Sequence, residues 1–363
     1  MGLRYALIGC GRIAVKHYEA AIQSGLDIVA ICDVSDAILS QFAKGNNLSA
    51  TVSRYTSYID LLNGEELDII AIATPSGSHY TIAACCIKHG VNVIIEKPIT
   101  MCLEEADILI RLCQENKITA TVCHQNRFNL SVKKVYEAIA EKKISKISHA
   151  CAHVRWNRST AYYEQSSWRG TWLNDGGAIM NQGIHNVDIL RWVCGGQIEE
   201  VFAYIDNLQH PNIEVEDIAL AVAKFSSGCY GTIEVTTNVY PCNLEETLYI
   251  FSDNGTIKLG GQSVNTIEHW DLQDETENAT SIITKNSETP VDIYGNGHIA
   301  LYSDFIDSIF MKKAPFISLK EGRDSLEFVL AIYKSSLTRQ PVRFPIESDF
   351  SISNMTTFGG ARQ

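Results

Sequence analysis

The sequence predicts an α/β protein with two domains: an N-terminal doubly wound parallel sheet, followed by a C-terminal α/β domain with an open, mainly antiparallel sheet. A length of 363 residues suits two domains better than one. Short apolar runs alternate with helical patterns over the first third of the chain, whereas partial alternation of apolar and polar residues prevails beyond Ser145. We assign residues 1–122 to the first domain and residues 123–319 to the second.

The first domain alternates strands and helices. Continuous runs of Val, Ile and Ala, as in residues 68–74 and 92–95, belong to strands that are buried on both faces, as in parallel sheets. The strands we expect are residues 4–8, 27–32, 68–74, 92–95 and 119–123. The helical patterns between them cover residues 17–23, 36–43, 81–88 and 104–115. This alternation predicts right-handed crossovers and a doubly wound sheet.

The second domain has shorter connections. Turns such as Ser226–Gly228 and Asp253–Gly255 join neighbouring runs, and such short joints imply antiparallel pairing. The strands we expect are residues 148–156, 199–205, 219–225, 229–236 and 247–251. The helices we expect are residues 185–193, 300–310 and 322–337. Residues 271–290 are polar, and we expect a surface loop there.

The composition excludes several classes of protein. A formal charge of −12 argues against a nucleic-acid binder or a protein of anionic membrane surfaces, since both need a basic face. No apolar run approaches the length of a membrane span. The 11 cysteines are scattered without a C-x-x-C pair, which suits neither a disulfide framework nor a zinc site. We expect a cytoplasmic protein with reduced, mostly buried thiols, and no room for a signal peptide before Arg4.

The segment Gly9–Ala14 follows the first expected strand and opens a helix with the spacing G-x-G-x-x-A. The first glycine permits a tight turn, the second lets the backbone approach a pyrophosphate, and the small third residue packs helix against strand. The helix N-terminus offers N–H groups and a positive dipole to the phosphates. This is the Rossmann fingerprint, and it indicates a dinucleotide cofactor. The cofactor-binding candidates in it are Gly9, Gly11, Arg12 and Ile13.

Asp33 ends the second expected strand, where a carboxylate accepts hydrogen bonds from the adenosine ribose. A carboxylate there repels a 2′-phosphate, and Val34 and Ser35 supply no arginine to hold one. We therefore infer NAD rather than NADP as the cofactor. The alternative is a glycine turn in a flavodoxin-like domain, with Asp33 capping the next helix.

Three further segments directly follow expected strands: Thr74–His79, Glu96–Pro98 and His124–Phe128. Open α/β sheets bind ligands beyond the carboxyl ends of their strands, so all three segments can reach the cofactor crevice. The candidates for cofactor contacts in them are Thr74, Pro75, His79, Glu96, Lys97, Gln125 and Asn126. A satisfied core position or a pocket wall suits His79 nearly as well.

The G-x-G-x-x-A turn, T-P-x-x-x-H, Glu-Lys-Pro and the later Gly-Ile-His-Asn-Val-Asp at residues 183–188 together resemble the Gfo/Idh/MocA oxidoreductases. Four motifs in this order, spread over essentially the whole chain, are specific to that family. The resemblance implies a Rossmann domain, a second domain with an open antiparallel sheet, and oxidation or reduction of sugars and cyclitols with NAD or NADP. It also implies that a helix at about residues 320–337 packs back towards the first domain, and that the open sheet forms homodimers or homotetramers.

Further segments resemble the UDP-N-acetylglucosaminuronate 3-dehydrogenases within this family. They are Arg155–Trp156, Arg158, Tyr162–Tyr163, Ser167–Trp172, Asp175–His185, Asn243–Thr247 and Tyr294–His298. This resemblance implies NAD-dependent oxidation of the 3-hydroxyl of UDP-N-acetyl-2-amino-2-deoxy-D-glucuronate, bound between the domains, in surface polysaccharide (O-antigen) biosynthesis. The alternatives are another sugar or inositol dehydrogenase of the family, or a catalytically silent NAD-binding sensor.

Lys97 and His185 are the catalytic candidates. An ammonium group can hydrogen-bond the reacting hydroxyl, and an imidazole has a suitable pKa to take the hydroxyl proton as hydride leaves. The resemblance matches both residues to catalytic positions, places Glu96 near the nicotinamide ribose, and leaves open which of the two is the base. Asp188 follows His185 on the same helix face and could orient it. The alternatives are a solvent-facing lysine paired with Glu96, and a structural histidine.

The substrate-binding candidates combine cations with aromatic rings: Lys97, Arg127, Arg155, Arg158, Tyr162, Trp168, Arg169, Asn181 and His185. Arginine forks suit a diphosphate or a carboxylate, and the rings of Tyr162, Tyr163, Trp168 and Trp172 offer faces to a uracil or a sugar. Asn181 stands where inositol-type members of the family carry an aspartate, and an amide spares an anionic sugar the repulsion of that carboxylate. Ordinary aromatic core packing is the alternative for this group.

The other histidines carry weaker signals. His17 is expected on a helix surface, and His298 fits a core position as well as a pocket wall. No histidine, cysteine and carboxylate residues stand at metal-ligand spacing, and hydride transfer to a nicotinamide needs none, so we expect no metal.

Overall fold

The computed structural model describes residues 2–288, 295–347, 350–356 and 358. The chain forms two compact units: the first comprises residues up to 125 together with 298–323, and the second comprises residues 126–297 together with those from 324 onward. Residues 298–319 thus belong to the first unit, whereas the sequence predicts them in the second domain. They carry Tyr302, whose hydroxyl lies 2.9 Å from that of Tyr5 in the first sheet.

The first unit contains a six-stranded sheet in the order β3-β2-β1-β4-β5-β6, in which every neighbouring pair is parallel. Its strands are β1 (Arg4–Ile8), β2 (Asp27–Cys32), β3 (Ser53–Tyr55), β4 (Ile69–Ile72), β5 (Asn92–Ile95) and β6 (Ala120–Val122). This order confirms the predicted doubly wound sheet. β3 is absent from the prediction because its three residues are too few and too polar to form an apolar run.

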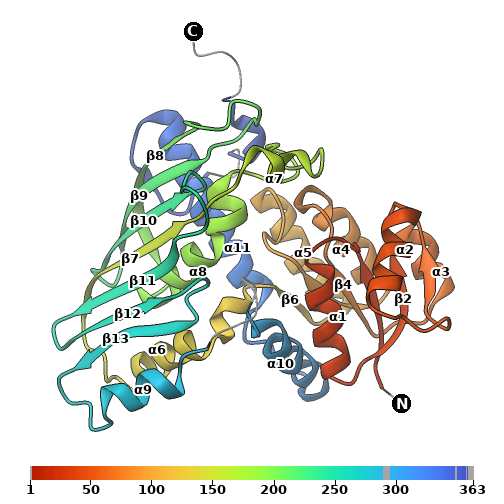
Figure 1. The fold of residues 1–363 in the computed structure, drawn as a ribbon, viewed down its shortest axis with the longest axis horizontal. Helices are drawn as coiled ribbons and strands as arrows, with labels where there is room; N and C mark the ends of the chain where they lie inside the picture. Colours follow the sequence, from red (N-terminus) through yellow and green to blue (C-terminus); the bar gives the residue numbers. More distant parts are fainter. Residues whose placement is uncertain (1, 289–294, 348–349, 357, 359–363) are drawn as a thin grey trace. The chain divides into compact units, whose positions relative to one another are not determined.

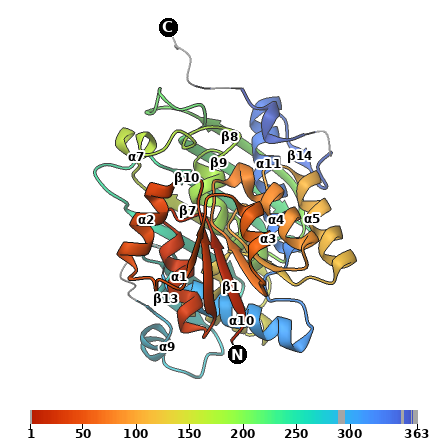
Figure 2. The ribbon, with the colours of Figure 1, turned by 90° about the vertical axis from the view of Figure 1, so that its right-hand side faces the viewer.

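Helices cover both faces of this sheet. Figure 2 shows α1 and α2 on one side of it and α4 and α5 on the other. The helices of this unit are α1 (Ala14–Gln23), α2 (Asp36–Gly45), α3 (Tyr58–Gly64), α4 (His79–Lys88), α5 (Leu103–Asn116) and α10 (Gly297–Met311). Because α10 returns to this unit from a distant part of the sequence, it can supply side chains to the interior near the first strands.

The prediction of a surface position for His17 is wrong. The residue is fully buried, and its Nδ1 lies 2.7 Å from the hydroxyl of Tyr302. Helix α1 begins at Ala14, three residues before the helical pattern is apparent, so His17 lies in its first turn. Ala14, His17 and Ala21 share one helix face, and all three are buried.

The second unit contains an eight-stranded sheet in the order β13-β12-β11-β7-β10-β9-β8-β14. Its strands are β7 (Ile147–Arg155), β8 (Ile198–Asp206), β9 (Ile218–Phe225), β10 (Tyr230–Thr236), β11 (Glu245–Ser252), β12 (Gly255–Gly260), β13 (Thr266–Leu272) and β14 (Val342–Arg343). Only the pair of β7 and β10 is parallel among these neighbours in the described part of the chain. The predicted open, mainly antiparallel sheet is confirmed.

One face of this second sheet is covered by helices. In Figure 1, α8 and α11 lie on the same side of the sheet, and α8 packs against β7 and β10. The opposite face exposes large side chains of β8 and β9, among them Tyr204, Leu220 and Val222. The helices of this unit are α6 (Leu130–Ala140), α7 (Thr160–Glu164), α8 (Ile184–Val193), α9 (Ala279–Lys285) and α11 (Leu319–Thr338), whose first residues belong to the first unit.

The loop expected at residues 271–290 is not a single loop. β13 continues to Leu272, and α9 occupies Ala279–Lys285, while residues 289 and 290 lie outside the described residues. The side chain of Asn278 accepts hydrogen bonds from two N–H groups at the start of α9, and Ile282 is fully buried. A helix cap and one buried residue thus stabilise a segment whose polar composition is typical of a loop.

The predicted burial of most cysteines is confirmed. All 11 are free, most are buried, and only Cys242 is exposed. Within the described part of the chain, no helix combines the length and the apolar character needed to cross a membrane.

A buried ion pair joins three segments of the second unit. Arg127 donates from Nε and from a terminal nitrogen to the two oxygens of Asp188 on α8, both at 2.6 Å, and its guanidinium lies 5.0 Å from the centre of the Trp192 ring. Ser325 on α11 donates to the same carboxylate at 2.6 Å. Arg127 and Asp188 are 1% and 0% exposed, so each charge depends on the other for stabilisation.

Replacing Asp188 by Ala should destabilise the second unit by about 3–5 kcal/mol, because Arg127 would keep a buried charge without its counter-ion. Calorimetry should show a melting transition lowered by at least about 5 °C. The matched control is Glu347→Ala, which removes an exposed partner of Lys334 at 2.8 Å and should leave the melting transition nearly unchanged. Equal effects of the two substitutions would contradict the account of this pair.

Candidate active site

The turn after β1 has the backbone of a dinucleotide-binding loop. Gly9 adopts φ +93°, and a Cβ there would lie 2.5 Å from the carbonyl oxygen of Ala73, so only glycine fits. A Cβ on Gly11 would meet no atom within 4 Å, which leaves open space over the turn. Arg12 is exposed and Ile13 half-buried, directly before α1 begins. The N–H groups at this helix start can therefore hold a diphosphate.

Asp33 follows β2 beside this turn. Its two oxygens accept the N–H of Cys10 at 2.9 Å and that of Ser35 at 3.0 Å, which fixes the carboxylate while leaving it half-buried. The adjacent Val34 is 91% exposed and gives an apolar surface next to the carboxylate, a feature that sequence reasoning did not identify. A fixed carboxylate suits ribose hydroxyls and repels a 2′-phosphate, so the site fits NAD.

His79 connects two strand ends of the first sheet. It is 1% exposed, and its Nδ1 and Nε2 lie 2.8 and 3.0 Å from the carbonyl oxygens of Pro98 and Thr74. Burial lowers the pKa of His79, whereas both carbonyl acceptors favour the protonated ring, because only imidazolium donates from both nitrogens. The structure therefore places His79 as a brace between the turns after β4 and β5, with its ring nitrogens occupied by backbone.

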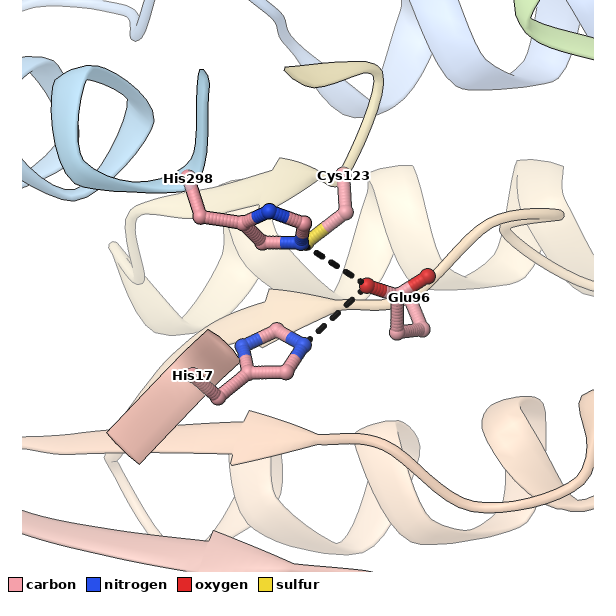
Figure 3. Close-up of side chains that lie close together, drawn as sticks. All are labelled: His17, Glu96, Cys123 and His298. Carbon is pink, nitrogen blue, oxygen red and sulfur yellow. Dashed lines mark hydrogen bonds and ion pairs between the residues drawn. The ribbon is translucent and has the colours of Figure 1, made fainter. Parts of the chain in front are cut away.

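The turn after β5 presents Lys97. Its side chain is partly exposed, and its backbone N–H donates to Oε2 of Glu96 at 3.1 Å. Oε1 of Glu96 lies 3.1 Å from Nε2 of His17 and 3.4 Å from Nε2 of His298. Figure 3 shows both rings directed at this oxygen. Burial alone would raise the pKa of Glu96, but these two histidines hold that pKa well below its ordinary value. Glu96 is thus an anion engaged by the histidines.

One group of possible metal ligands occurs among the described residues: His17, Glu96, Cys123 and His298. Their donor atoms lie within 4.8 Å of one another, and all four residues are buried. The donor types suit zinc. The nitrogen–oxygen distances of 3.1 and 3.4 Å are those of N–H···O hydrogen bonds, so the two histidines engage Glu96 directly. Nδ1 of His298 is buried without a hydrogen-bond partner in the part of the chain that the structure describes. Sequence spacing did not reveal the group, because its members come from four distant segments.

In the second unit, a π-helical turn at Ile179–Gly183 runs directly into α8. Asn181 lies in this turn, is partly exposed, and donates from Nδ2 to Asp175. His185 follows in the first turn of α8 and is also partly exposed. Asp188, expected to orient His185, accepts hydrogen bonds from Arg127 and Ser325. The π-helical turn therefore brings Asn181 and His185 to the start of one helix.

Glu216 accepts a hydrogen bond from the start of this π-helical turn, and the sequence analysis did not identify it. It is fully buried, and its Oε1 accepts the N–H of Ile179 at 3.0 Å and the hydroxyl of Tyr333 at 3.1 Å. Burial raises the pKa of Glu216 to about 8, so the carboxyl is mainly protonated at neutral pH. A Cβ on Gly177 would lie 1.5 Å from Glu216, so the glycine before the turn leaves space for this carboxyl.

Arginines and aromatic rings gather beside a cavity of about 360 Å³ in the second unit. The guanidinium carbons of Arg158 and Arg169 lie 5.0 and 4.3 Å from the centre of the Tyr162 ring, and that of Arg169 lies 4.7 Å from the Trp168 ring. The cavity is lined by Thr160, Tyr163, Glu164, Ser166, Ser167, Arg169, His210, Pro211, Asn212 and Ile213. Such a mixture of a cation, rings and hydroxyl or amide groups is typical of a site for a polar ligand.

Three candidates for substrate contacts lie elsewhere. Arg155 donates to Glu234 and Glu245 on the neighbouring strands at 2.6–2.8 Å, so its charge is matched within the sheet. Trp172 is 4% exposed, and Arg127 is held by the buried ion pair. Gln125 and Asn126 are buried, and Asn126 donates to Glu246 at 3.3 Å. Tyr294 lies outside the described residues.

Comparison with known proteins decides the family. Residues 3–124 match the description "Oxidoreductase family, NAD-binding Rossmann fold", and residues 132–258 match "GFO/IDH/MocA C-terminal domain". The chain is 34% identical to the WlbA dehydrogenase of Chromobacterium violaceum, over 95% of its own length and 97% of that protein, with a TM-score of 0.86. The chain belongs to the Gfo/Idh/MocA oxidoreductase family.

Other members of the Gfo/Idh/MocA family resemble the chain over similar lengths. The WlbA dehydrogenase of Bordetella pertussis is 32% identical, with coverage of 95% of this chain and 98% of that one and a TM-score of 0.85. Both WlbA structures are complexes with NADH and UDP-GlcNAcA. The myo-inositol 2-dehydrogenase of Thermotoga maritima is 22% identical over 94% of this chain and 98% of that protein. This chain is therefore an NAD-binding oxidoreductase, and its Gly9 turn and Asp33 fit that cofactor.

The protein should bind NADH at least about 100-fold more tightly than NADPH, because like charges about 4 Å apart repel by up to ~4 kcal/mol near a protein surface. The double variant Asp33→Ser/Val34→Arg should reverse this preference, since serine retains a short oxygen acceptor and arginine meets the 2′-phosphate. Fluorescence titration with both nucleotides measures the ratio. The control Asp36→Ser, on the exposed start of α2, should leave the ratio unchanged, and a reversal there would refute the role of Asp33.

Proposed function

We propose that this protein oxidises the 3-hydroxyl of UDP-N-acetyl-2-amino-2-deoxy-D-glucuronate to the 3-keto sugar with NAD, within nucleotide-sugar metabolism for surface polysaccharide. The observation that carries the proposal is the arginine–aromatic group beside the cavity of the second unit. The likeness to the two WlbA dehydrogenases supports it, at 34% and 32% identity against 22% for the myo-inositol 2-dehydrogenase.

A nucleotide-sugar needs one region for its diphosphate and base and another for its sugar. Two guanidinium groups lie over the ring of Tyr162, and this concentration of positive charge favours a diphosphate. The hydroxyl of Tyr162 accepts from Arg169 and from Gln182, the latter at 3.4 Å. Gln182 stands next to Asn181 in the π-helical turn that leads to His185. The cavity region is therefore linked directly to the segment proposed to meet the sugar.

The chemistry requires the loss of a hydride from C3 and of a proton from its hydroxyl. Bound NAD accepts the hydride. We assign the proton to Lys97 or His185: imidazole can take it near neutral pH, and an ammonium group can hold the developing oxyanion. Both side chains are partly exposed, as groups that meet a substrate must be.

Asn181 favours an anionic sugar. Its Nδ2 donates to Asp175, whose other oxygen accepts the N–H of Gly170 at 2.7 Å. An aspartate at position 181 would bring a second carboxylate against Asp175 as well as against a uronate. An amide avoids both repulsions and retains an oxygen that can accept from the substrate.

We also propose that the protein works in the cytoplasm as a homodimer or homotetramer formed through the uncovered face of the second sheet. Tyr204, Leu220, Val222 and Tyr230 are 45–64% exposed on this face. Contiguous exposed apolar side chains of this kind are typical of subunit interfaces.

Incubation of the purified protein with NAD and UDP-N-acetylglucosaminuronate should produce NADH and a nucleotide-sugar that is lighter by two hydrogens in mass spectrometry. Myo-inositol, run in parallel, should give no NADH. NADH from the free polyol alone would contradict the proposal and assign the protein to the inositol dehydrogenases.

Lys97→Met and His185→Gln separate catalysis from binding in this assay. Each should lower kcat by about 10²–10⁴-fold, the usual contribution of a positioned acid or base. NADH affinity, measured by fluorescence, should change by less than about 3-fold, since binding rests mainly on the turn at Gly9. Full activity in both variants would remove these residues from the mechanism.

Arg169→Lys tests the diphosphate region. It should raise the KM for the UDP-sugar by about 10–100-fold with little change in kcat, because a charge-assisted bond in fork geometry is worth about 1.5–3 kcal/mol. Arg155→Lys is the matched control, since Arg155 is held by Glu234 and Glu245 within the sheet, and its KM should stay within about 3-fold. A larger effect from Arg155→Lys would invert the assignment of the two arginines.

A further inference from the structure

Glu96 is a buried anion whose stabilisation comes from two helices. It is 6% exposed, and both imidazole rings of His17 and His298 are directed at the same oxygen of its carboxylate (Figure 3). An isolated carboxylate in such a place would take up a proton, because burial penalises its charge. The arrangement supplies N–H donors where water is excluded.

We propose that His17 and His298 are positioning residues for the dehydrogenase reaction: they clamp Glu96 and thereby hold the turn from Glu96 to Pro98 that presents Lys97. This inference rests on the role proposed for Lys97. Neither histidine needs to touch substrate or cofactor.

The clamp acts on Lys97 through the second oxygen of Glu96. That oxygen, Oε2, accepts the backbone N–H of Lys97 at 3.1 Å, while Oε1 receives the two imidazoles at 3.1 and 3.4 Å. The orientation of the carboxylate therefore fixes the peptide group at which Lys97 begins. On the other side of the turn, His79 holds the carbonyl oxygen of Pro98 at 2.8 Å.

His17 is itself fixed by a chain of hydroxyl groups. Its Nδ1 lies 2.7 Å from the hydroxyl of Tyr302, which lies 2.9 Å from that of Tyr5. With the ring proton of His17 on Nε2, donating to Glu96, Nδ1 accepts from Tyr302 and Tyr302 accepts from Tyr5, so every group has a partner. Tyr302 follows His298 by one turn of α10, and the same helix therefore supplies one arm of the clamp and the support of the other.

The other groups around Glu96 do not replace these donors. The titratable or charged side chains that face it are His17 on α1, His298 and Tyr302 on α10, His79 on α4, Cys123 after β6, and Lys97. Burial raises the pKa of the Cys123 thiol and of the Tyr302 hydroxyl well above their ordinary values, so both are neutral. Burial also lowers the pKa of His298, whose contribution is therefore an N–H donor more than a charge.

Loss of one imidazole should make the carboxylate of Glu96 easier to protonate. Burial would then be opposed by one imidazole instead of two, and the pKa of Glu96 would rise. Its carboxyl would then take up a proton as the pH falls, and the acceptor for the N–H of Lys97 would be weakened. Activity should fall at acid pH and return above the new pKa.

The test compares pH profiles of kcat/KM for the NAD-loaded protein on the UDP-sugar. In His298→Phe and His17→Phe, the acid limb should move up by about two pH units, with activity recovered at alkaline pH. His298→Gln, which restores an N–H donor, should bring the limb back to within about half a unit. Glu96→Gln should lack this limb, and adding His298→Phe to it should cost little more, because the two residues act as one unit. His89→Phe, an exposed histidine of the same unit, is the matched control and should keep the wild-type profile.

A second measurement does not depend on the substrate. Infrared difference spectra against Glu96→Gln, recorded over a pH series, should show the Glu96 carboxylate taking up its proton at a higher pH in His298→Phe than in the wild type. If the UDP-sugar is not oxidised at all, this arm still decides whether the clamp ionises Glu96, so failure of the proposed function remains distinguishable.

The proposal is overturned if alkaline pH does not restore kcat/KM in His298→Phe and His17→Phe. It is also overturned if kcat/KM of His298→Gln is lowered as much as that of His298→Phe. It is likewise overturned if Glu96 takes up its proton at the same pH in His298→Phe as in the wild type. Finally, one equivalent of zinc in the purified wild-type protein, lost in His298→Phe, would assign these side chains to a metal centre instead.

Discussion

The stabilisation of one buried carboxylate, Glu96, is the constraint on which the first unit depends. Its position at the end of β5 places it where the carboxyl ends of parallel strands meet, and water is excluded there. The donors must come from the protein, and they come from α1 and α10. This requirement gives a physical reason for the return of α10 to the first unit, and it connects the dinucleotide-binding helix to the turn that carries Lys97.

In the second unit, some arginines are paired with carboxylates of the protein, and others lie beside the cavity where a ligand could bind. Arg127 is matched by Asp188 and Arg155 by two glutamates, whereas Arg158 and Arg169 flank an aromatic ring beside a cavity. The protein carries a net charge of −12, and both of its proposed ligands are anions. Their binding therefore depends on local groups, namely a helix N-terminus and a few cations, against the overall sign of the protein.

Local features of the site were predictable from the sequence, and long-range features were not. The turn at Gly9–Ala14 and the strand-end position of Lys97 follow from spacing, because strand, turn and helix adjoin in the chain. His17 was misplaced because the helix begins earlier than its pattern indicates, and its partner His298 is separated from it by most of the chain. Sequence alone also gave no means to tell Arg155, which has partners across strands, from the arginines at the cavity.

The central claim is the oxidation of the sugar at C3, and isotope transfer tests it most directly. With UDP-N-acetylglucosaminuronate deuterated at C3, the account predicts that the deuterium appears in the NADH formed and that the reaction slows by a primary isotope effect. NADH without deuterium from this substrate, or NADH labelled only when a different sugar carbon is deuterated, would contradict the account.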